Sequence, residues 1–341
     1  MQETSKPEPN PALVFDAAQG YMRTFTVRAG VELDVFTEIA KGSQTVPEMA
    51  KACRASERGV RILCDCLVVL GLLTKAGDRY SLVPESAPFL DRRSPAYLGG
   101  AFKFLLDPVH LENARRLPDA IRDGQGGKLK HSLAPEDPIW IEFARGMAPM
   151  VVPSAQAIAQ LLGPLLAAKA APKVLDIAAG HGIFGITVAQ QVAAAQIYAV
   201  DWANVLEVAR ENAQARGVAA RHHPIPGSAF DVDYGSGYDA VLVTNFLHHF
   251  DVATNQSLLR KVYTAMNSGG RLVIVEFVPN EDRVSPPMAA MFSMTMLSNT
   301  PHGDAYTFSE LSSMCHNAGF QEAQLTRLEP LPQSLVVAQK P

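Results

Sequence analysis

The stretch that determines the fold runs Val174-Leu175-Asp176-Ile177-Ala178-Ala179-Gly180-His181-Gly182-Ile183-Phe184-Gly185. Its first four residues are bulky and apolar apart from one carboxylate, which is typical of a buried strand. The next five residues are small except for one histidine, and apolar residues then recur at helical spacing. A strand that passes through small residues into a helix exposes free backbone N–H groups and the positive end of the helix dipole. Because glycine and alanine leave room beside the backbone, we predict that a cofactor binds at this turn.

Two cofactors compete for this turn. The spacing Gly180-x-Gly182-x-x-Gly185 matches the dinucleotide fingerprint, in which a pyrophosphate lies at the helix N-terminus. Asp176 argues against a dinucleotide, because a carboxylate at the strand end would repel a pyrophosphate but attract the cationic groups of S-adenosylmethionine. The second predicted strand ends at Asp201, which can accept hydrogen bonds from ribose hydroxyls of either cofactor. An ordinary tight turn is disfavoured because the turn and both acidic strand ends occur together, and Asp176 favours S-adenosylmethionine.

Strands and helices alternate from Pro172 onwards, which predicts a parallel sheet with helices on both faces. After the first two strands, 174–177 and 196–200, three more are predicted near 222–225, 240–244 and 271–277. Two last strands, 324–326 and 334–338, are predicted to pair antiparallel, and such a terminal hairpin is foreign to dinucleotide-binding folds. The predicted class for this half is α/β, Rossmann-like, with a mostly parallel sheet and a C-terminal antiparallel hairpin.

The first part of the chain has a different pattern. Residues 12–40 look helical, Thr45 and Ser56 are positioned to cap the next two helices, and 74–83 has the pattern of a hairpin. This order is that of a winged helix, which serves either DNA binding or dimerisation and packing. The second of the two capped helices is apolar nearly all round, whereas a helix in the major groove needs a polar face. We therefore expect a mainly helical winged-helix dimerisation domain.

Bulk composition is compatible with this division. The 341 residues allow two domains, 48% are hydrophobic and 19% charged, and the net charge of −4 gives no electrostatic case for nucleic acid. No apolar run long enough for a bilayer is recognised, and the four cysteines are expected to be buried thiols in a reducing cytoplasm. The predicted domains are a disordered lead-in at 1–11, the winged-helix domain at 12–105, a helical connector at 106–165 and the cofactor domain at 166–341.

Side chains at the carboxyl ends of neighbouring parallel strands should meet at one edge of the sheet. These ends carry Asp176, Asp201, the segment 245–249 and Glu276. The segment holds two adjacent histidines, and an imidazole with a pKa near about 6.5 can take up a proton at neutral pH. Two readings stay open for the histidines, a catalytic site or a surface pair. Two also stay open for Glu276, which could hold an imidazole or form a salt bridge to a lysine or arginine.

On these residues, the region 172–338 resembles a class I S-adenosylmethionine-dependent methyltransferase. From about Leu13 on, the chain resembles small-molecule O-methyltransferases with an N-terminal winged-helix dimerisation domain, such as plant caffeate-type and bacterial polyketide-tailoring enzymes. The family's glycine motif, Asp-Val-Gly-Gly-Gly-Thr-Gly, stands here as 176–182 with alanine at two glycine positions. Its ribose-binding acid matches Asp201, and its adenine loop, Gly-Asp-Met/Phe-Phe, matches 227–230, where serine replaces the acid.

The resemblance also implies roles for single residues. The family's catalytic base lies in Leu-His-Asp-Trp, which matches 247–250, so His248 is the implied general base and His249 stands in place of the aspartate. Glu276 matches the first of two glutamates that flank the base in plant members, and the second would fall at about Ala305 unless Asp304 substitutes for it. The implied cofactor-binding residues are Asp176, Gly180, Gly182, Asp201, Trp202, Ser228, Ala229, Phe230 and Asn245.

The implied activity is methyl transfer from S-adenosylmethionine to a hydroxyl of a small aromatic or polyketide-like acceptor, by a cytoplasmic homodimer that uses no metal, nucleic acid or membrane. Phe143, Met147, Met291 and Phe292 are predicted to bind the acceptor, although both the aromatic cluster near Trp140 and the Met-rich stretch could be plain packing. Other chemistries of the same cofactor stay open, namely C-methylation, hydroxylation or decarboxylation. So does a cofactor-sensing DNA-binding regulator. A metal site built from His248, His249, Asp251, His302 and Asp304 lacks regular spacing.

Overall fold

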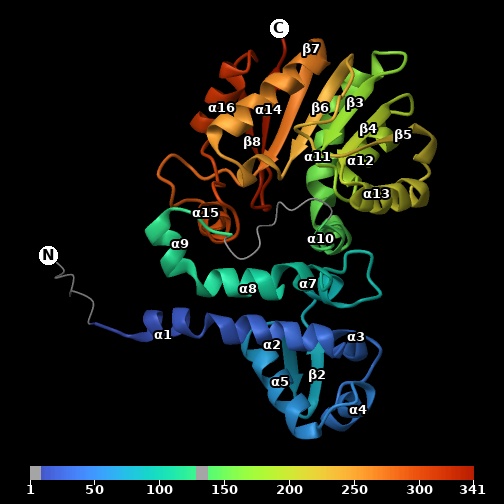
Figure 1. Cartoon of the computed structure of the whole chain (residues 1–341). Helices are drawn as coiled ribbons and strands as arrows, with labels where there is room; N and C mark the ends of the chain where they lie inside the picture. The colour runs from blue at the N-terminus through green and yellow to red at the C-terminus, as the bar shows by residue number, and fades with distance from the viewer. Residues whose placement is uncertain (1–8, 128–136) are drawn as a thin grey trace, which may run out of the picture. The chain divides into compact units, whose positions relative to one another are not determined.

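A computed structural model of the protein describes residues 9–127 and 137–341. The chain divides into two compact units, Met1–Phe102 and Lys103–Pro341, whose elements are labelled in Figure 1. Most of the lead-in predicted at 1–11 lies outside the described residues. The boundary between the units falls inside α7 (Ala101–Leu105), and the finer division of the second unit into a connector and a cofactor domain stays a prediction.

The N-terminal unit is helical and carries one small hairpin. Thr45 and Glu48 form a capping box at the start of α4, and the Ser56 hydroxyl accepts the Gly59 N–H at the start of α5 at 3.1 Å, so both predicted caps are confirmed. The hairpin pairs β1 with β2 antiparallel, and Tyr80 on β2 is buried in the unit's core. The elements are α1 (Ala12–Ala18), α2 (Gly20–Glu32), α3 (Val35–Ala40), α4 (Val46–Ala52), α5 (Glu57–Val69), β1 (Leu73–Ala76), β2 (Arg79–Leu82) and α6 (Ala87–Leu90).

The second unit is built on a seven-stranded sheet with the order β5-β4-β3-β6-β7-β9-β8. Strands β3 to β7 run parallel, and β9 pairs antiparallel with both β7 and β8. This arrangement confirms the predicted fold class, including the antiparallel pair at the C-terminus. The strands are β3 (Lys173–Ile177), β4 (Gln196–Asp201), β5 (His222–Pro226), β6 (Tyr238–Thr244), β7 (Met266–Glu276), β8 (Gln324–Arg327) and β9 (Ser334–Gln339).

Alternate residues of the strands belong to two different cores, one on each face of the sheet. Val174 of β3 packs with α11 and α12, whereas the next residue, Leu175, packs with α14 and α16. This period of two is expected for pleated strands covered on both faces, and Figure 1 shows the helices on either side. The helices are α11 (Val152–Ala167), α12 (Ile183–Gln191) and α13 (Ala203–Ala215) on one face, with α14 (Val252–Ala265) and α16 (Phe308–Asn317) on the other.

The helices that precede the sheet form a continuous apolar run. The helical segment 139–167 is long and apolar enough by composition to cross a membrane, although 44% of its most apolar window is buried inside the protein. From the sequence no such run was recognised, and Pro149, Pro153 and Pro164 were expected to interrupt this segment. Pro149 and Pro153 lie in first helical turns, where the missing N–H removes no helical hydrogen bond, whereas Pro164 lies inside α11. The segment comprises α10 (Ile139–Met147), η1 (Ala148–Val151) and α11, whose buried face packs on α12.

The remaining helices surround the open end of the sheet. Helices α8 and α9 pack on α15, and the Asn113 side-chain amide donates to the side-chain oxygen of Asn299 at 3.1 Å. These helices are α8 (Pro108–Arg115), α9 (Leu117–Asp123) and α15 (Pro287–Asn299), and two short 3₁₀ turns are η2 (Ala219–Arg221) and η3 (Leu247–His249).

Candidate active site

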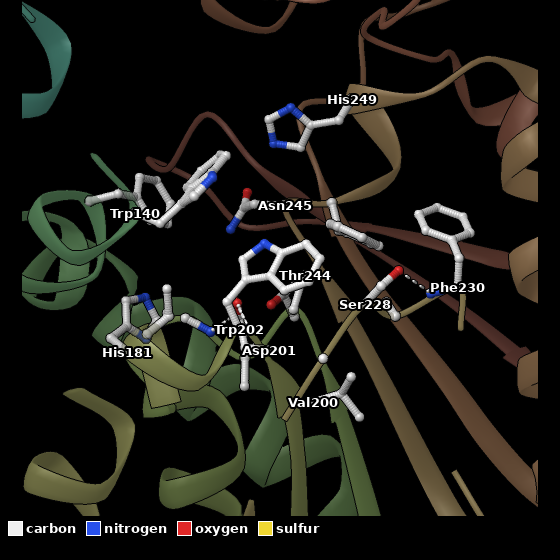
Figure 2. A pocket seen from close by; sticks show the side chains of 18 of the residues that line it. Trp140, His181, Val200, Asp201, Trp202, Ser228, Phe230, Thr244, Asn245 and His249 are labelled. Carbon is white, nitrogen blue, oxygen red and sulfur yellow. Dashed lines mark hydrogen bonds between the residues drawn. The ribbon is translucent and has the colours of Figure 1, made fainter. Parts of the chain in front are cut away.

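A cavity of about 340 Å³ lies at the carboxyl ends of β3, β4 and β6. Figure 2 shows side chains from the glycine turn, from the loops after these strands and from α10 around it. Of the residues predicted to bind the cofactor, seven line this cavity: Gly180, Asp201, Trp202, Ser228, Ala229, Phe230 and Asn245.

The backbone of the turn after β3 is left-handed at three positions. Gly180 and Gly182 have φ of +57° and +72°, and Ala178 adopts φ +53° despite its Cβ. A Cβ on Gly182 would lie 2.9 Å from that of Ala209, whereas one on Gly180 would meet nothing closer than 3.9 Å. The second glycine is therefore required by both conformation and space, and the first by conformation and by its position at the cavity wall.

His181 closes this turn with its ring. Its Nδ1 accepts the N–H of Ile183, the first residue of α12, at 3.1 Å, and the side chain also lines the cavity. Burial lowers the pKa of His181 to about 3, so the ring is neutral and carries its proton on Nε2. The turn thus presents one uncharged imidazole and little other side-chain bulk to the cavity, while the N–H groups of Ala179, Gly180 and Gly182 are bonded within the protein.

Asp201 ties the first two strand ends together. One carboxylate oxygen accepts the Gly180 N–H at 2.8 Å and the other accepts the Trp202 N–H at 2.7 Å. Burial raises the pKa of Asp201 to about 6, against the effect of these two bonds. Each carboxylate oxygen can accept more than one hydrogen bond, so Asp201 can still receive ribose hydroxyls at the cavity wall.

Asp176 does not reach the cavity, and the sequence reading differs from the structure here. It is completely buried below the turn, where one oxygen accepts the Gly185 N–H of α12 at 3.0 Å. Its other oxygen is buried with no hydrogen-bond partner among the described residues, and burial raises its pKa to about 7. The carboxyl group therefore holds the first turn of α12, the helix that follows the glycine turn. Any attraction for a cationic ligand acts through space. Gly182 likewise shapes the turn without lining the cavity.

The loop after β5 closes another side of the cavity. The Ser228 hydroxyl accepts the Phe230 N–H at 3.2 Å, and the Phe230 ring packs edge-on against Phe250 with centroids 4.9 Å apart. Behind the loop, Lys261 Nζ donates to the carbonyl oxygens of Phe230 and Ala229 at 2.8 and 3.3 Å. The loop therefore presents an aromatic face while the half-buried ammonium group of Lys261 holds its backbone.

His248 and Glu276 form a buried pair beside the cavity. His248 lies in η3 after β6, Glu276 ends the neighbouring strand β7, and Nδ1 of the histidine lies 2.6 Å from one carboxylate oxygen. The other carboxylate oxygen accepts the backbone N–H groups of Phe246 and His248 at 2.9 and 3.3 Å. Of the two alternatives for Glu276, the structure supports the one in which it holds an imidazole. No lysine or arginine pairs with it in the described parts of the chain.

Comparison with known proteins identifies the family. A model of the O-methyltransferase domain matches residues 142–321, more than half of the chain, and a model of the O-methyltransferase dimerisation domain matches residues 15–92. The chain belongs to the S-adenosylmethionine-dependent O-methyltransferase family. The family assignment confirms the enzyme class and the cofactor predicted from the sequence, against a dinucleotide enzyme.

Individual relatives agree with this assignment. A solved structure from Nostoc punctiforme, described as that of an O-methyltransferase, is 49% identical, covers 98% of this chain and 100% of its own, and has a TM-score of 0.92. The 3-hydroxy-5-methyl-1-naphthoate 3-O-methyltransferase of Streptomyces sahachiroi is 28% identical over 93% of this chain and 91% of its own. The human N-acetylserotonin methyltransferase, solved in complex with S-adenosylmethionine, shares the fold with a TM-score of 0.81 at 22% identity, covering 100% of this chain and 99% of its own.

The predicted acceptor residues of the methyltransferase are only partly brought together. Phe143 of α10 lines the cavity, and the Phe292 ring meets the His248 ring edge-on at 4.9 Å. Met147 is half-buried, and Met291 is 73% exposed and does not line the cavity.

At the position where the plant-type pattern has its second glutamate, this chain has Ala305, which is fully buried. The half-exposed Asp304 carboxylate beside it lies 3.5 Å from Arg283. Aromatic rings lie close to His248, since Phe292 also stacks on Phe277 with centroids 3.9 Å apart. In the part of the chain that the structure describes, no group of three metal-ligating side chains is found, and independence of metal stays a prediction.

Several cavity residues were not predicted as binding residues. Trp140 was considered only as one of several packing or lid residues, and it lines the cavity together with Phe143. The others lie at or just after strand ends, where position alone was a usable signal, or come from helices, where no local pattern marked them. They are Ala178, Ala179, His181, Phe184, Val200, Val205, Gly227, Asp231, Thr244, Phe246 and Phe250.

Proposed function

We propose that this O-methyltransferase transfers the methyl group of S-adenosylmethionine to a hydroxyl of a small aromatic or polyketide-like acceptor, with His248 as general base. The 2.6 Å contact between His248 and Glu276 carries this proposal. A carboxylate at Nδ1 keeps the histidine proton on that nitrogen and leaves Nε2 with a free lone pair. Glu276 also stabilises the imidazolium ion that forms when Nε2 takes up a proton.

The residues around the cavity support a division of tasks. Asp201 is placed to accept the ribose hydroxyls, the small residues of the glycine turn let the amino-acid end lie close to the backbone, and Phe230 offers an aromatic face to the adenine. When bound, the cofactor supplies an activated methyl group on a sulfonium. His248 removes the acceptor's hydroxyl proton as the oxygen attacks, and the surrounding aromatic rings exclude water.

An aromatic acceptor is supported by the rings near the base and by the names of relatives. Phe292 and Phe277 stack beside His248, and flat rings favour offset or edge-on contacts with such a wall. The Streptomyces relatives are named for a hydroxynaphthoate and for tetracenomycin.

We also propose that the protein works as a homodimer. The dimerisation-domain match covers residues 15–92, and large apolar side chains on α1 and α2 are exposed, with Leu13 at 83%. Exposed apolar surface of this kind is typical of a protein–protein interface. Light scattering should give twice the 36.8 kDa mass of the chain. A monomer at micromolar concentration would contradict the proposal.

The His248→Ala variant tests the general base. General-base help is worth about a hundred- to ten-thousandfold, so transfer of a labelled methyl group to a panel of phenols should fall by that factor. Affinity for S-adenosylhomocysteine, measured by calorimetry, should stay nearly unchanged, whereas Asp201→Ala should weaken that affinity first. The control is His316→Ala, which removes an exposed histidine from the last turn of α16. Equal losses of turnover and cofactor affinity in His248→Ala would count against the base assignment.

A further inference from the structure

His249 contacts the cavity in a different way from its neighbour His248. Its Nδ1 is buried and has no hydrogen-bond partner among the described residues, while another part of its ring lines the cavity. Aromatic rings surround it, with centroids at 5.7 Å for Trp140 and 6.1 Å for Phe250. In Figure 2 the His249 ring lies at the rim beyond Trp140 and Asn245.

These surroundings keep His249 uncharged. Burial, the larger cause, and the neighbouring His248, the smaller, hold the pKa of His249 well below its ordinary value. The imidazole of His249 therefore carries only one proton at neutral pH. A proton on Nδ1 would be a buried donor without an acceptor, which is strongly disfavoured. The favoured tautomer therefore carries its proton on Nε2, at the side of the ring that is left to face the cavity.

The two adjacent histidines thus offer opposite functions. Glu276 accepts a hydrogen bond from Nδ1–H of His248, which leaves Nε2 of that ring as a proton acceptor. Nε2 of His249, in contrast, is a hydrogen-bond donor. The two ring centroids are 4.3 Å apart. One small molecule can therefore contact both rings, giving a proton to one and receiving a hydrogen bond from the other.

We propose that His249 determines acceptor specificity by donating an Nε2–H hydrogen bond to a second oxygen next to the hydroxyl that is methylated. The acceptor class is then an aromatic compound whose reacting hydroxyl has a carbonyl oxygen at the ortho or peri position. In such compounds the hydroxyl donates an intramolecular hydrogen bond to the carbonyl oxygen and is a poor nucleophile. His249 competes for the carbonyl and frees the O–H for His248. As that proton leaves, negative charge spreads onto the carbonyl oxygen, so the bond from His249 strengthens in the transition state.

This proposal rests on the proposed O-methylation, and a matched pair of probes tests it. 2-Acetyl-1-naphthol has the ortho carbonyl and 1-naphthol lacks it. Wild-type enzyme should methylate the acetyl compound with a kcat/KM about tenfold or more above that of 1-naphthol, a factor typical of one buried hydrogen bond. His249→Leu should abolish this preference by lowering kcat/KM for the acetyl compound about tenfold or more beyond any change for 1-naphthol. His249→Gln, which retains a side-chain N–H at similar reach, should keep part of the preference.

Each other outcome decides against the donor role. The proposal is overturned if wild-type enzyme shows no preference, if it methylates neither probe, or if His249→Leu slows both probes equally. Failure of the proposed function itself would appear separately, as absence of S-adenosylhomocysteine binding in calorimetry. Nitrogen-15 NMR of the histidine rings, assigned with His249→Gln, gives a direct second readout. It should show a neutral Nε2–H tautomer through pH 6 to 8, and a proton on Nδ1 or a titration near about 6.5 would refute the assignment.

Discussion

The two glycines of the turn after β3 should respond differently to the same added methyl group. Both have a left-handed φ, +57° at Gly180 and +72° at Gly182. Only at Gly182 is space lacking, because a Cβ would lie 2.9 Å from Ala209 Cβ and 3.1 Å from a methyl of Ile186. Comparing Gly180→Ala with Gly182→Ala therefore separates the cost of conformation from the cost of packing.

The magnitudes follow from these two terms. An L-residue in the left-handed region costs about 1–2 kcal/mol, and loss of glycine's freedom in the unfolded chain offsets about 0.4–1 kcal/mol of that. Gly180→Ala should therefore lower the free energy of unfolding by about 0–1.6 kcal/mol. Gly182→Ala adds an overpacking cost of about 1–3 kcal/mol, for a total of about 1–5 kcal/mol. Ala178, at φ +53°, already bears the conformational term in the wild-type turn.

Urea unfolding followed by tryptophan fluorescence measures these losses in the relevant unit. The chain has two tryptophans, Trp140 and Trp202, and both belong to the unit 103–341. Calorimetry with S-adenosylhomocysteine should show the reverse order, because a Cβ on Gly180 lies at the cavity wall, 4.0 Å from Phe143. If Gly180→Ala lowers the urea midpoint as much as Gly182→Ala does, the packing argument is wrong.

Three further substitutions, one of them with a matched control, test supports of the site and of the fold. Lys261→Met should weaken S-adenosylhomocysteine binding severalfold in calorimetry, because Lys261 holds two carbonyls of loop 227–231. Lys340→Met, which removes a similar ammonium lying 2.8 and 2.9 Å from two carbonyls far from the cavity, should leave that affinity unchanged. Burial raises the pKa of Asp176 to about 7, so ionisation of this carboxyl destabilises the fold as pH rises from about 4 to 7. Asp176→Asn should therefore reduce the fall in Tm over that pH range, measured in the cofactor-free enzyme. Burial opposes ionisation of Asp239, but hydrogen bonds, the first from a lysine 2.6 Å away, lower its pKa below the usual value. Asp239→Asn should therefore lower the Tm at pH 7, with a difference from wild type that shrinks below about pH 4.

Local patterns in the sequence were enough to predict most of the second unit. The strands are apolar runs bounded by turn residues. In the first unit, likewise, the caps at Thr45 and Ser56 depend only on residues within one helical turn. The orientation of Asp176 was missed although the signal was present. Its neighbours on both sides face the core of α14 and α16, so alternation along the strand directs the carboxylate to the opposite face, where the Gly185 N–H lies.

The walls of the cavity could not be predicted in this way, since they depend on contacts between distant segments. Trp140 comes from a helix more than 30 residues before β3, and nothing in its local sequence shows that it meets His249. Met291 belongs to a Met-rich stretch of the kind expected at an acceptor site, yet its side chain lies on the exposed face of α15. Composition indicates which side chains suit a ligand, whereas helix orientation decides which of them reach it.

The adjacent histidines show how far tertiary contacts determine chemistry. By side-chain chemistry alone His248 and His249 are equivalent candidates, and in the sequence only the resemblance to the family motif points to His248 as the base. The decision comes from Glu276, 28 residues after His248 on the neighbouring strand, whose carboxylate reaches only the first ring. In the second ring, that of His249, Nδ1 is buried among aromatic side chains without a hydrogen-bond partner among the described residues. Its Nε2 is therefore a donor, whereas Nε2 of His248 is an acceptor. A substitution such as Glu276→Gln should therefore lower turnover by removing the carboxylate that orients His248, while the tautomer of His249, read by nitrogen-15 NMR, stays the same, since no hydrogen bond links that carboxylate to the His249 ring.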